Sequence, residues 1–407
     1  MRGGGLGSRM TGSESPAHPS AGIPHGDRTT GAPSGPVERA RRFVEEVLVP
    51  ARRSIDREDR IPEHILEGLR RGGFLGLSLP REYGGLGLST LEVARTVEEI
   101  GAGSAAVGTL VAVHVSVASY PILRWGTSAQ KEAYLPRLAC GEWIGAFALT
   151  EPSAGSDAQS LETSYGREGT AFRLRGSKTF ISNARLAKVF VTFARSPEAP
   201  PPGISAFLVH PGTPGFTISP PFRKLGIHGS DTCELSFDDV PVPPEGLLGS
   251  EGQGFRIAME TLGAGRIAIA ALSLGIARAG YEALREELAR RSEPWQRALL
   301  ARAHVDVEAS RALVERAAVL RDDGLPFAQA ASTAKLYASQ AAFRIASNGL
   351  DVAGREALDR ENPSPLEQLF RDARVLSIVE GTTEIQEMIL GRSLVPTPPG
   401  APPRAPS

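Results

Sequence analysis

The spacing of apolar residues changes twice along this 407-residue chain, and that change limits the folds open to it. From Val37 to Trp143, apolar side chains recur every three or four residues, which is typical of amphipathic helices. From Ile144 to about Gly249, short β-rich runs are separated by Gly, Pro and Asp clusters. From Gly254 to Arg392, long Ala- and Leu-rich stretches are helical again. The pattern predicts a multi-domain α+β protein.

The predicted domains follow these changes of pattern. We expect a disordered extension over residues 1–36, a helical domain over 37–143, an antiparallel β-barrel or sandwich over 144–250, a four-helix bundle over 251–392 and a disordered tail over 393–407. The two ends are rich in Gly, Ser and Pro and poor in large apolar residues. The central strands do not alternate with helices, which argues against a nucleotide-binding βαβ unit.

Charge and cysteine content restrict the expected partners and location. Lys and Arg number 45 against 46 Asp and Glu, so the net charge is −1 and no nucleic-acid or anionic-membrane partner is predicted. The apolar run Ala105–Leu123 contains His114 and several small residues, which favours a buried helix over a membrane span. Cys140 and Cys233 lie far apart, and no metal-ligand motif is visible. A cytoplasmic location is expected.

Two segments around the predicted strands carry residues suited to a planar cofactor with a phosphate tail. In the segment 147–157, Thr150 offers a compact hydroxyl, while Gly155 and Ser156 allow backbone amides to approach a polar group. In the segment 176–184, Phe180 offers an aromatic face. Each feature alone is more simply explained as a turn or a core aromatic.

A third segment, residues 371–386, contains the candidate proton acceptor. Glu380 is followed by Gly381, which fits a turn that presents the carboxylate. Taken alone, this pair would be read as a solvated helix end. Two other acids are predicted to be structural: Glu151, and Asp372 through pairing with a neighbouring cation.

Together and in this order, the three segments resemble the acyl-CoA dehydrogenase family over about Val37 to Arg392. The resemblance implies that the chain binds FAD. The implied flavin-binding positions are Phe147, Leu149, Thr150, Gly155, Ser156, Phe180, Ile181, Ser182, Thr382 and Glu384.

The resemblance also implies a reaction, the α,β-dehydrogenation of an acyl thioester. Glu380 would take the α proton while the β hydrogen leaves as hydride to flavin N5. Ser156, Arg266 and Gly381 match substrate-binding positions, although a surface role for Arg266 remains an alternative. The implied partners are an acyl-CoA or acyl-carrier-protein substrate, an electron-transfer flavoprotein or oxygen as acceptor, and further copies of the chain in a homodimer or homotetramer.

Three departures from the family pattern raise alternatives. The stretches 288–296 and 350–354 lack the motifs that relatives place near FAD of a neighbouring subunit, and Gly263 stands where an acidic residue is common. These changes suggest a specialised-metabolism member acting on a carrier-bound acyl group. They also leave open a binding or scaffold protein without redox activity, or a flavin oxidase of a hydroxyacyl or aminoacyl thioester.

Overall fold

The computed structural model describes residues 1, 35–196, 203–290, 293–359 and 364–395. Most of the predicted extension and tail therefore lies outside the described residues. The first and last helices extend one and two residues beyond the predicted helical ranges. Pro36 begins the first helix, a position that tolerates proline because its N–H would have no partner there. At the other end, the last helix runs to Leu394 and stops where Val395, which precedes a proline, becomes extended.

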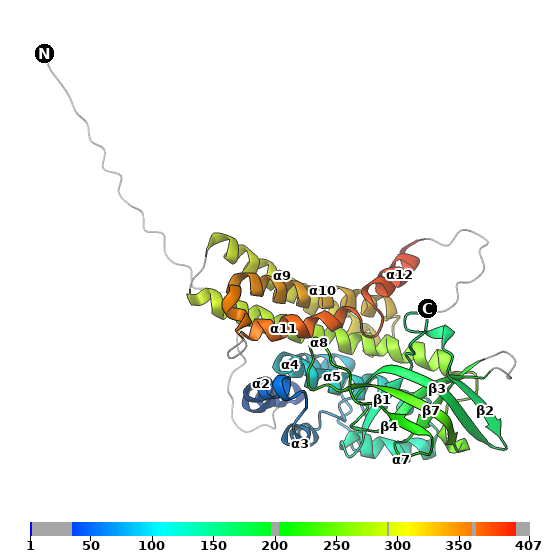
Figure 1. Cartoon of the computed structure of the whole chain (residues 1–407). Coiled ribbons are helices and arrows are strands. Elements are labelled where there is room, and N and C mark those ends of the chain that lie inside the picture. Colours follow the sequence, from blue (N-terminus) through cyan, green and yellow to red (C-terminus); the bar gives the residue numbers. More distant parts are fainter. Residues whose placement is uncertain (2–34, 197–202, 291–292, 360–363, 396–407) are drawn as a thin grey trace. The chain divides into compact units, whose positions relative to one another are not determined.

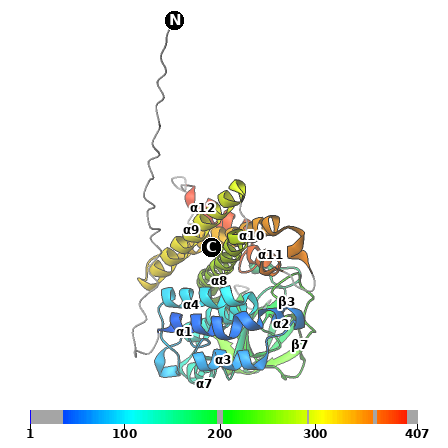
Figure 2. The same cartoon turned by 90° about the vertical axis from the view of Figure 1, so that its left-hand side faces the viewer.

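Helices make up the first part of the described chain, as predicted (Figure 2). Thr127 and Gln130 form a reciprocal capping box at the start of α7, which satisfies two free backbone N–H groups. Two short π-helical segments, η1 and η3, continue α1 and α5. The elements are α1 (Pro36–Phe43), η1 (Val44–Leu48), α2 (Val49–Glu58), α3 (Glu63–Gly72), η2 (Arg81–Tyr83), α4 (Thr90–Gly103), α5 (Ala105–Val113), η3 (His114–Ser119), α6 (Tyr120–Trp125) and α7 (Ser128–Ala139).

The middle domain is one eight-stranded sheet with strand order β6-β7-β3-β2-β4-β5-β8 and β1 beside β4. Most pairings are antiparallel, as predicted, but β1 runs parallel to β4 and β2 makes one parallel pairing with β4. A parallel pairing needs a long crossover, and residues 149–186 supply it. The strands are β1 (Ile144–Ala148), β2 (Ser164–Glu168), β3 (Ala171–Ser182), β4 (Ala187–Arg195), β5 (Ile204–Val209), β6 (Phe216–Ile218), β7 (Thr232–Val242) and β8 (Leu247–Leu248).

Three long helices and one short helix form the C-terminal bundle, with α10 packed against α8, α9 and α11 (Figure 1). Their apolar faces supply a large share of the main core. A further helix, α12, follows the bundle. The bounds are α8 (Gly254–Arg290), α9 (Pro294–Asp322), α10 (Ala328–Ala353), α11 (Pro365–Ala373) and α12 (Thr383–Leu394), with the short 3₁₀ segments η6 (Gly354–Leu358) and η7 (Arg374–Ser377).

Helix α8 packs against the N-terminal helices α4 and α5, and one buried leucine lies at this junction. Leu272 is fully buried and points at Gly101 of α4 and Gly108 of α5. Two stretches, Ala105–Trp125 and Gly254–Ala289, are long and apolar enough to cross a membrane, but 78% and 83% of their apolar windows are buried inside the protein. The prediction of a buried helix from Ala105 is therefore confirmed.

A methyl group at Gly108 should weaken this junction. A Cβ there would lie 2.6 Å from Leu272 Cδ1 and 2.8 Å from Gly101 Cα, so Gly108→Ala should lower the free energy of unfolding by roughly 1–3 kcal/mol. Gly391→Ala is the matched control, because a Cβ at that helical position meets no atom within 4 Å. Urea unfolding of both variants measures the difference. Equal stability of the two would contradict the packing argument.

Candidate active site

Glu380 lies in the turn between η7 and α12, and its backbone is left-handed. Its φ is 52° and that of Gly381 is 97°. A non-glycine residue in this region is strained by contacts of its own Cβ, and such strain is typical of functional sites. Two left-handed residues in succession reverse the chain and direct the Glu380 side chain towards α8. The predicted turn at Gly381 is present.

Two buried side chains hold the carbonyl groups of this turn. Lys335 of α10 donates from Nζ to the Gly381 oxygen at 2.6 Å. Gln386 of α12 donates from Nε2 to the oxygens of Glu380 and Gly381, both at 3.2 Å. Both side chains belong to fully buried residues. We call Lys335 and Gln386 the carbonyl clamp.

Neither residue of the clamp was predicted from the sequence. Lys335 carried a signal that could have found it, since it stands on the alanine face of α10 beside Ala331, Ala334 and Ala338. A lysine on a buried apolar stripe needs a specific partner. Gln386 carried no comparable signal.

The Glu380 carboxyl group is enclosed by α8. Both its oxygens are buried and have no hydrogen-bond partner within the described ranges. The space that they occupy exists because residue 265 is glycine: a Cβ there would overlap Glu380 Oε2 and lie 2.9 Å from Val117 Cγ1. Burial raises the pKa of Glu380 to about 8, although the nearby charges of Arg266 and Lys335 lower it. A carboxyl group that titrates near neutral pH suits proton transfer.

Arg266 is buried beside this carboxyl group, so the alternative of a surface arginine is wrong. It is 8% exposed, it donates weakly to Ser332 Oγ at 3.5 Å, and its Nε has no partner among the described residues. Burial lowers the pKa of Arg266, against the raising effect of Glu380. The site thus contains two buried cationic side chains and one carboxyl group.

The predicted flavin segments lie side by side at the ends of β1 and β3. The Thr179 N–H donates to the Thr150 oxygen at 2.9 Å. On either side of Thr150, Lys178 Nζ donates to the Leu149 oxygen at 3.1 Å and to Glu151 Oε1 at 2.6 Å. Glu151 also accepts from the N–H groups of residues 162 and 163, and this network gives it the structural role predicted for it.

Several of these residues present free groups at the surface of the middle domain. Phe180 is 65% exposed with a φ of 57°, and its ring lies 5.3 Å from that of Phe222. The Thr150 hydroxyl makes no hydrogen bond to any described residue, and Gly155 and Ser156 are exposed. An exposed aromatic ring, a free hydroxyl and an open glycine loop fit an isoalloxazine ring with its phosphate tail.

The side chains of other predicted flavin residues pack within the middle domain. Leu149 and Ile181 are buried in the apolar clusters of the middle domain, and Phe147 packs edge-on against Phe193 at 5.0 Å. Leu149 and Ile181 can meet a cofactor only through backbone atoms, whereas the Phe147 ring is half-buried. Ser182 is half-buried.

The last two predicted flavin residues lie at the start of α12. Thr382 Oγ1 accepts from the Ile385 N–H and caps this helix. Glu384 is exposed, and hydrogen bonds from its own backbone N–H and from Thr382 lower its pKa. Their contact with flavin stays a prediction.

Asp372 differs from its predicted role. Its carboxylate accepts from the Ile227 N–H, while the neighbouring Arg371 pairs with Asp56 and Glu367. Burial raises the pKa of Asp372 to about 6. The expected ion pair is wrong because two other acids already occupy the guanidinium of Arg371.

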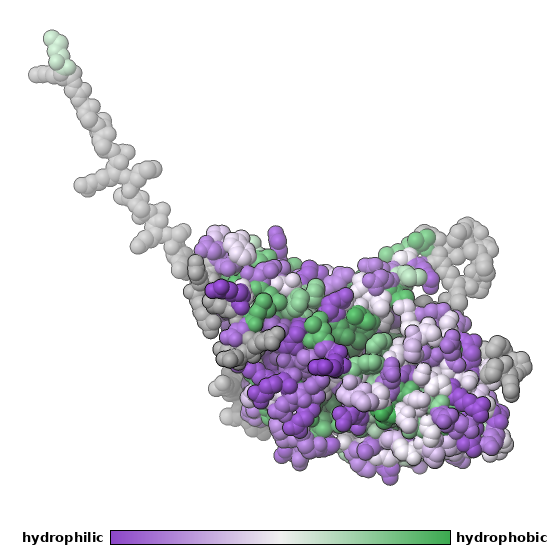
Figure 3. All heavy atoms as spheres, in the orientation of Figure 1, coloured by the Kyte–Doolittle hydropathy of each residue, from purple (hydrophilic) through white to green (hydrophobic). Residues whose placement is uncertain are grey.

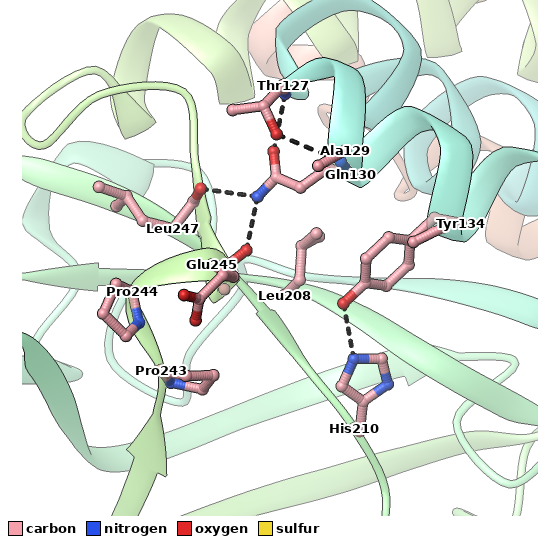
Figure 4. Close-up of a pocket in the computed structure, with 12 residues that line it drawn as sticks. Thr127, Ala129, Gln130, Tyr134, Leu208, His210, Pro243, Pro244, Glu245 and Leu247 are labelled. Carbon is pink, nitrogen blue, oxygen red and sulfur yellow. Dashed lines mark hydrogen bonds between the residues drawn. The ribbon is translucent and has the colours of Figure 1, made fainter.

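A separate surface groove between α7 and the sheet contains none of these residues (Figure 4). Tyr134 Oη lies 2.8 Å from His210 Nε2, and Gln130 Nε2 donates to the carbonyls of Glu245 and Leu247 at 2.8 Å. Every polar side chain named here has a partner within the protein. We assign the groove no part in the chemistry.

A helical domain, a sheet domain with flavin-binding loops and a helical bundle with a buried carboxyl group define a flavoprotein dehydrogenase. Models of the acyl-CoA dehydrogenase N-terminal, middle and C-terminal domains match residues 37–142, 146–240 and 252–395. The chain belongs to the acyl-CoA dehydrogenase family. It is an FAD-dependent oxidoreductase that acts on the CH–CH bond of an acyl thioester.

Individual relatives cover nearly the whole described chain. An acyl-CoA dehydrogenase of Bacillus subtilis (strain 168) is 40% identical over 365 residues, which are 87% of this chain and 96% of the relative. A chain in the solved structure of the electron transferring flavoprotein of Acidaminococcus fermentans is 36% identical with a TM-score of 0.85, covering 88% and 97%. The prolyl acyl carrier protein oxidase AnaB is 26% identical with a TM-score of 0.82, covering 88% and 97%.

The two neighbouring glycines of α8 offer a direct test of the site. Gly265→Ala should displace the Glu380 carboxyl group and slow flavin reduction by substrate about 10²-fold, the usual cost of a misplacement of about 1 Å. Gly263→Ala is the control, since the nearest atom to its Cβ would be Phe327 Cε2 at 3.9 Å. Stopped-flow absorbance measures both rates. Equal rates in the two variants would remove Gly265 from the site.

Proposed function

We propose that Glu380 is the base that removes the α proton of the acyl thioester. The observation that carries the proposal is a buried carboxyl group without any hydrogen-bond partner in the described chain, held by a strained turn against a glycine of α8. No hydrogen bond accounts for this carboxyl group, whereas the carboxyl groups of Glu151 and Asp372 accept from backbone N–H groups. Such an unpaired buried acid is costly unless a ligand uses it.

The backbone of the same residue offers the second group that the reaction needs. An α proton becomes acidic enough for a carboxylate only when the thioester oxygen is stabilised as negative charge develops there. The Glu380 N–H has no hydrogen-bond partner within the part of the chain that the structure describes. We assign this N–H as a donor to the thioester oxygen, so one residue would provide both the base and the oxyanion contact.

The proposed step moves one proton and one hydride. The Cα–H bond breaks and its proton passes to a Glu380 carboxylate oxygen, while the released electron pair forms the Cα=Cβ bond. FAD, when bound, accepts the hydride that leaves Cβ. Arg266 and Lys335 stabilise the carboxylate before the transfer, and Ser156 lies at the edge of the flavin segment, where we place the substrate's phosphopantetheine arm.

Glu380→Gln should retain bound FAD and lose its reduction by substrate. The amide keeps the shape of the side chain but cannot accept the proton, so the rate should fall by at least about 10³-fold. Flavin absorbance reports occupancy, and anaerobic stopped flow reports reduction. Glu387→Gln serves as the control because Glu387 lies on the exposed side of α12. Reduction at a near-normal rate in Glu380→Gln would reject Glu380 as the base.

We also propose that the acyl group can be carried by an acyl carrier protein. CoA and carrier proteins present the same phosphopantetheine arm, and the likeness to AnaB gives a precedent for a carrier-bound substrate on this fold. Position 263, where an acidic residue is common in the family, is glycine in this chain, which motivates a carrier other than CoA. We expect a matched acyl-carrier substrate to be oxidised at least about tenfold more efficiently than the acyl-CoA, a difference of about 1.4 kcal/mol in transition-state binding. Turnover with CoA alone would discard this part of the proposal.

The remaining proposals concern partners and location. An electron-transfer flavoprotein as acceptor is supported by the likeness to a chain in the Acidaminococcus fermentans structure. A homodimer or homotetramer is supported by apolar side chains exposed on and beside α12, where Ile378, Met388 and Leu394 are 51%, 50% and 70% exposed (Figure 3). A cytoplasmic location is supported by two unpaired cysteines, Cys140 and Cys233.

A further inference from the structure

Lys335 is a buried cation whose charge acts on Glu380, and the proposed proton and hydride transfers do not themselves require it. The residue is fully buried in α10, yet its ammonium group has one direct partner among the described residues, the Gly381 oxygen at 2.6 Å. A buried lysine without a salt bridge is costly. Burial lowers its pKa to about 8, while the proximity of Glu380 raises it.

Small neighbours on its own helix leave room for the Lys335 side chain. Ala331, Ala334 and Ala338 are fully buried around it on the same face of α10, so the side chain extends past small neighbours towards the turn. It reaches the turn from the bundle, whereas Gln386 reaches it from α12. The strained backbone of Glu380 and Gly381 is therefore held from two elements.

We propose that Lys335 is a positioning residue for the catalytic base: with Gln386 it fixes the left-handed turn, and its charge keeps the Glu380 carboxylate available to substrate. The proposal rests on the proposed role of Glu380. With Glu380 ionised and Lys335 protonated, Arg266 and Lys335 leave a surplus of one positive charge in a buried site. That surplus favours the negative charge that develops on the thioester oxygen when the α proton leaves.

The other elements around Glu380 do not replace the positive charge of Lys335. Arg266 approaches Glu380 from α8 and stays cationic over the whole working range of pH. From η3 the neighbouring side chain is Val117, which carries no charge. From the first turn of α12, Glu384 is exposed and negative, and it favours the charged form of Lys335 without adding positive charge to the site. Removal of Lys335 therefore removes half of the positive charge that faces the base.

The test compares FAD-loaded full-length variants by the pH dependence of flavin reduction in single turnovers. The wild-type rate should rise with pH and reach half its maximum near pH 8, because only the ionised base accepts a proton. Lys335→Met should move this midpoint up by about one pH unit and lower the maximal rate about 10²-fold. The dissociation constant of acyl-CoA should change less than about threefold, since the clamp does not face the substrate's carrier arm.

Two further variants separate charge from a merely structural role. Lys335→Arg keeps the charge and should return the midpoint to within about 0.3 pH unit of wild type. Arg344→Met removes another cation of α10, which pairs with Asp306 at 2.8 Å, and should leave the midpoint unchanged. Infrared difference spectra against Glu380→Gln should show the same shift in the titration of the Glu380 carboxyl group, independently of turnover.

A folded, FAD-containing Lys335→Met protein with an unchanged midpoint and a rate within threefold of wild type would overturn the proposal. If Lys335→Met fails to bind FAD, Lys335→Gln decides, because it keeps a donor for the Gly381 oxygen without the charge. A wild-type midpoint in that variant rejects the role of the charge, and a raised midpoint supports it. Failure of the base itself is distinguishable, since Glu380→Gln would then reduce flavin normally.

Discussion

The burial of the Glu380 carboxyl group against α8 is the constraint on which the site depends. Three helices make it possible. Helix α8 provides the space at Gly265 and a neighbouring charge from Arg266. The clamp of Lys335 in α10 and Gln386 in α12 fixes the turn. Loss of water around the carboxyl group outweighs the attraction of the two cations, and its pKa rises accordingly. The bundle thus encloses a carboxyl group whose pKa is raised to about 8 beside two buried cationic side chains.

The middle domain presents backbone amides and a hydroxyl from a loop that has little regular structure. The buried ion pair between Lys178 and Glu151 fixes that loop on either side of Thr150. Breaking a buried pair of this kind leaves an uncompensated charge and costs about 3–5 kcal/mol. The loop is therefore anchored beside Thr150, although it lies in the crossover between two parallel strands.

The sequence allowed the order of the domains, the turn at Glu380 and the segments around Thr150 and Phe180 to be predicted. These features depend on local pattern or on short motifs. Gly265 and the clamp could not be predicted, because their role depends on the rotation of α8, α10 and α12 about their axes. A glycine within a long helix only signals a loss of about 1 kcal/mol in helix propensity. The parallel pairing of β1 with β4 was missed because strand direction is not encoded in the alternation of side chains.

The energetics of the turn explain why its contacts must come from outside it. A left-handed glutamate costs about 1–2 kcal/mol relative to ordinary backbone conformations. The three hydrogen bonds to the carbonyls of residues 380 and 381 contribute about 1 kcal/mol each, and the one from the lysine more, because its donor is charged. The clamp therefore outweighs the strain. Its donors belong to α10 and α12, so the geometry of the base depends on these two helices as well as on the turn itself.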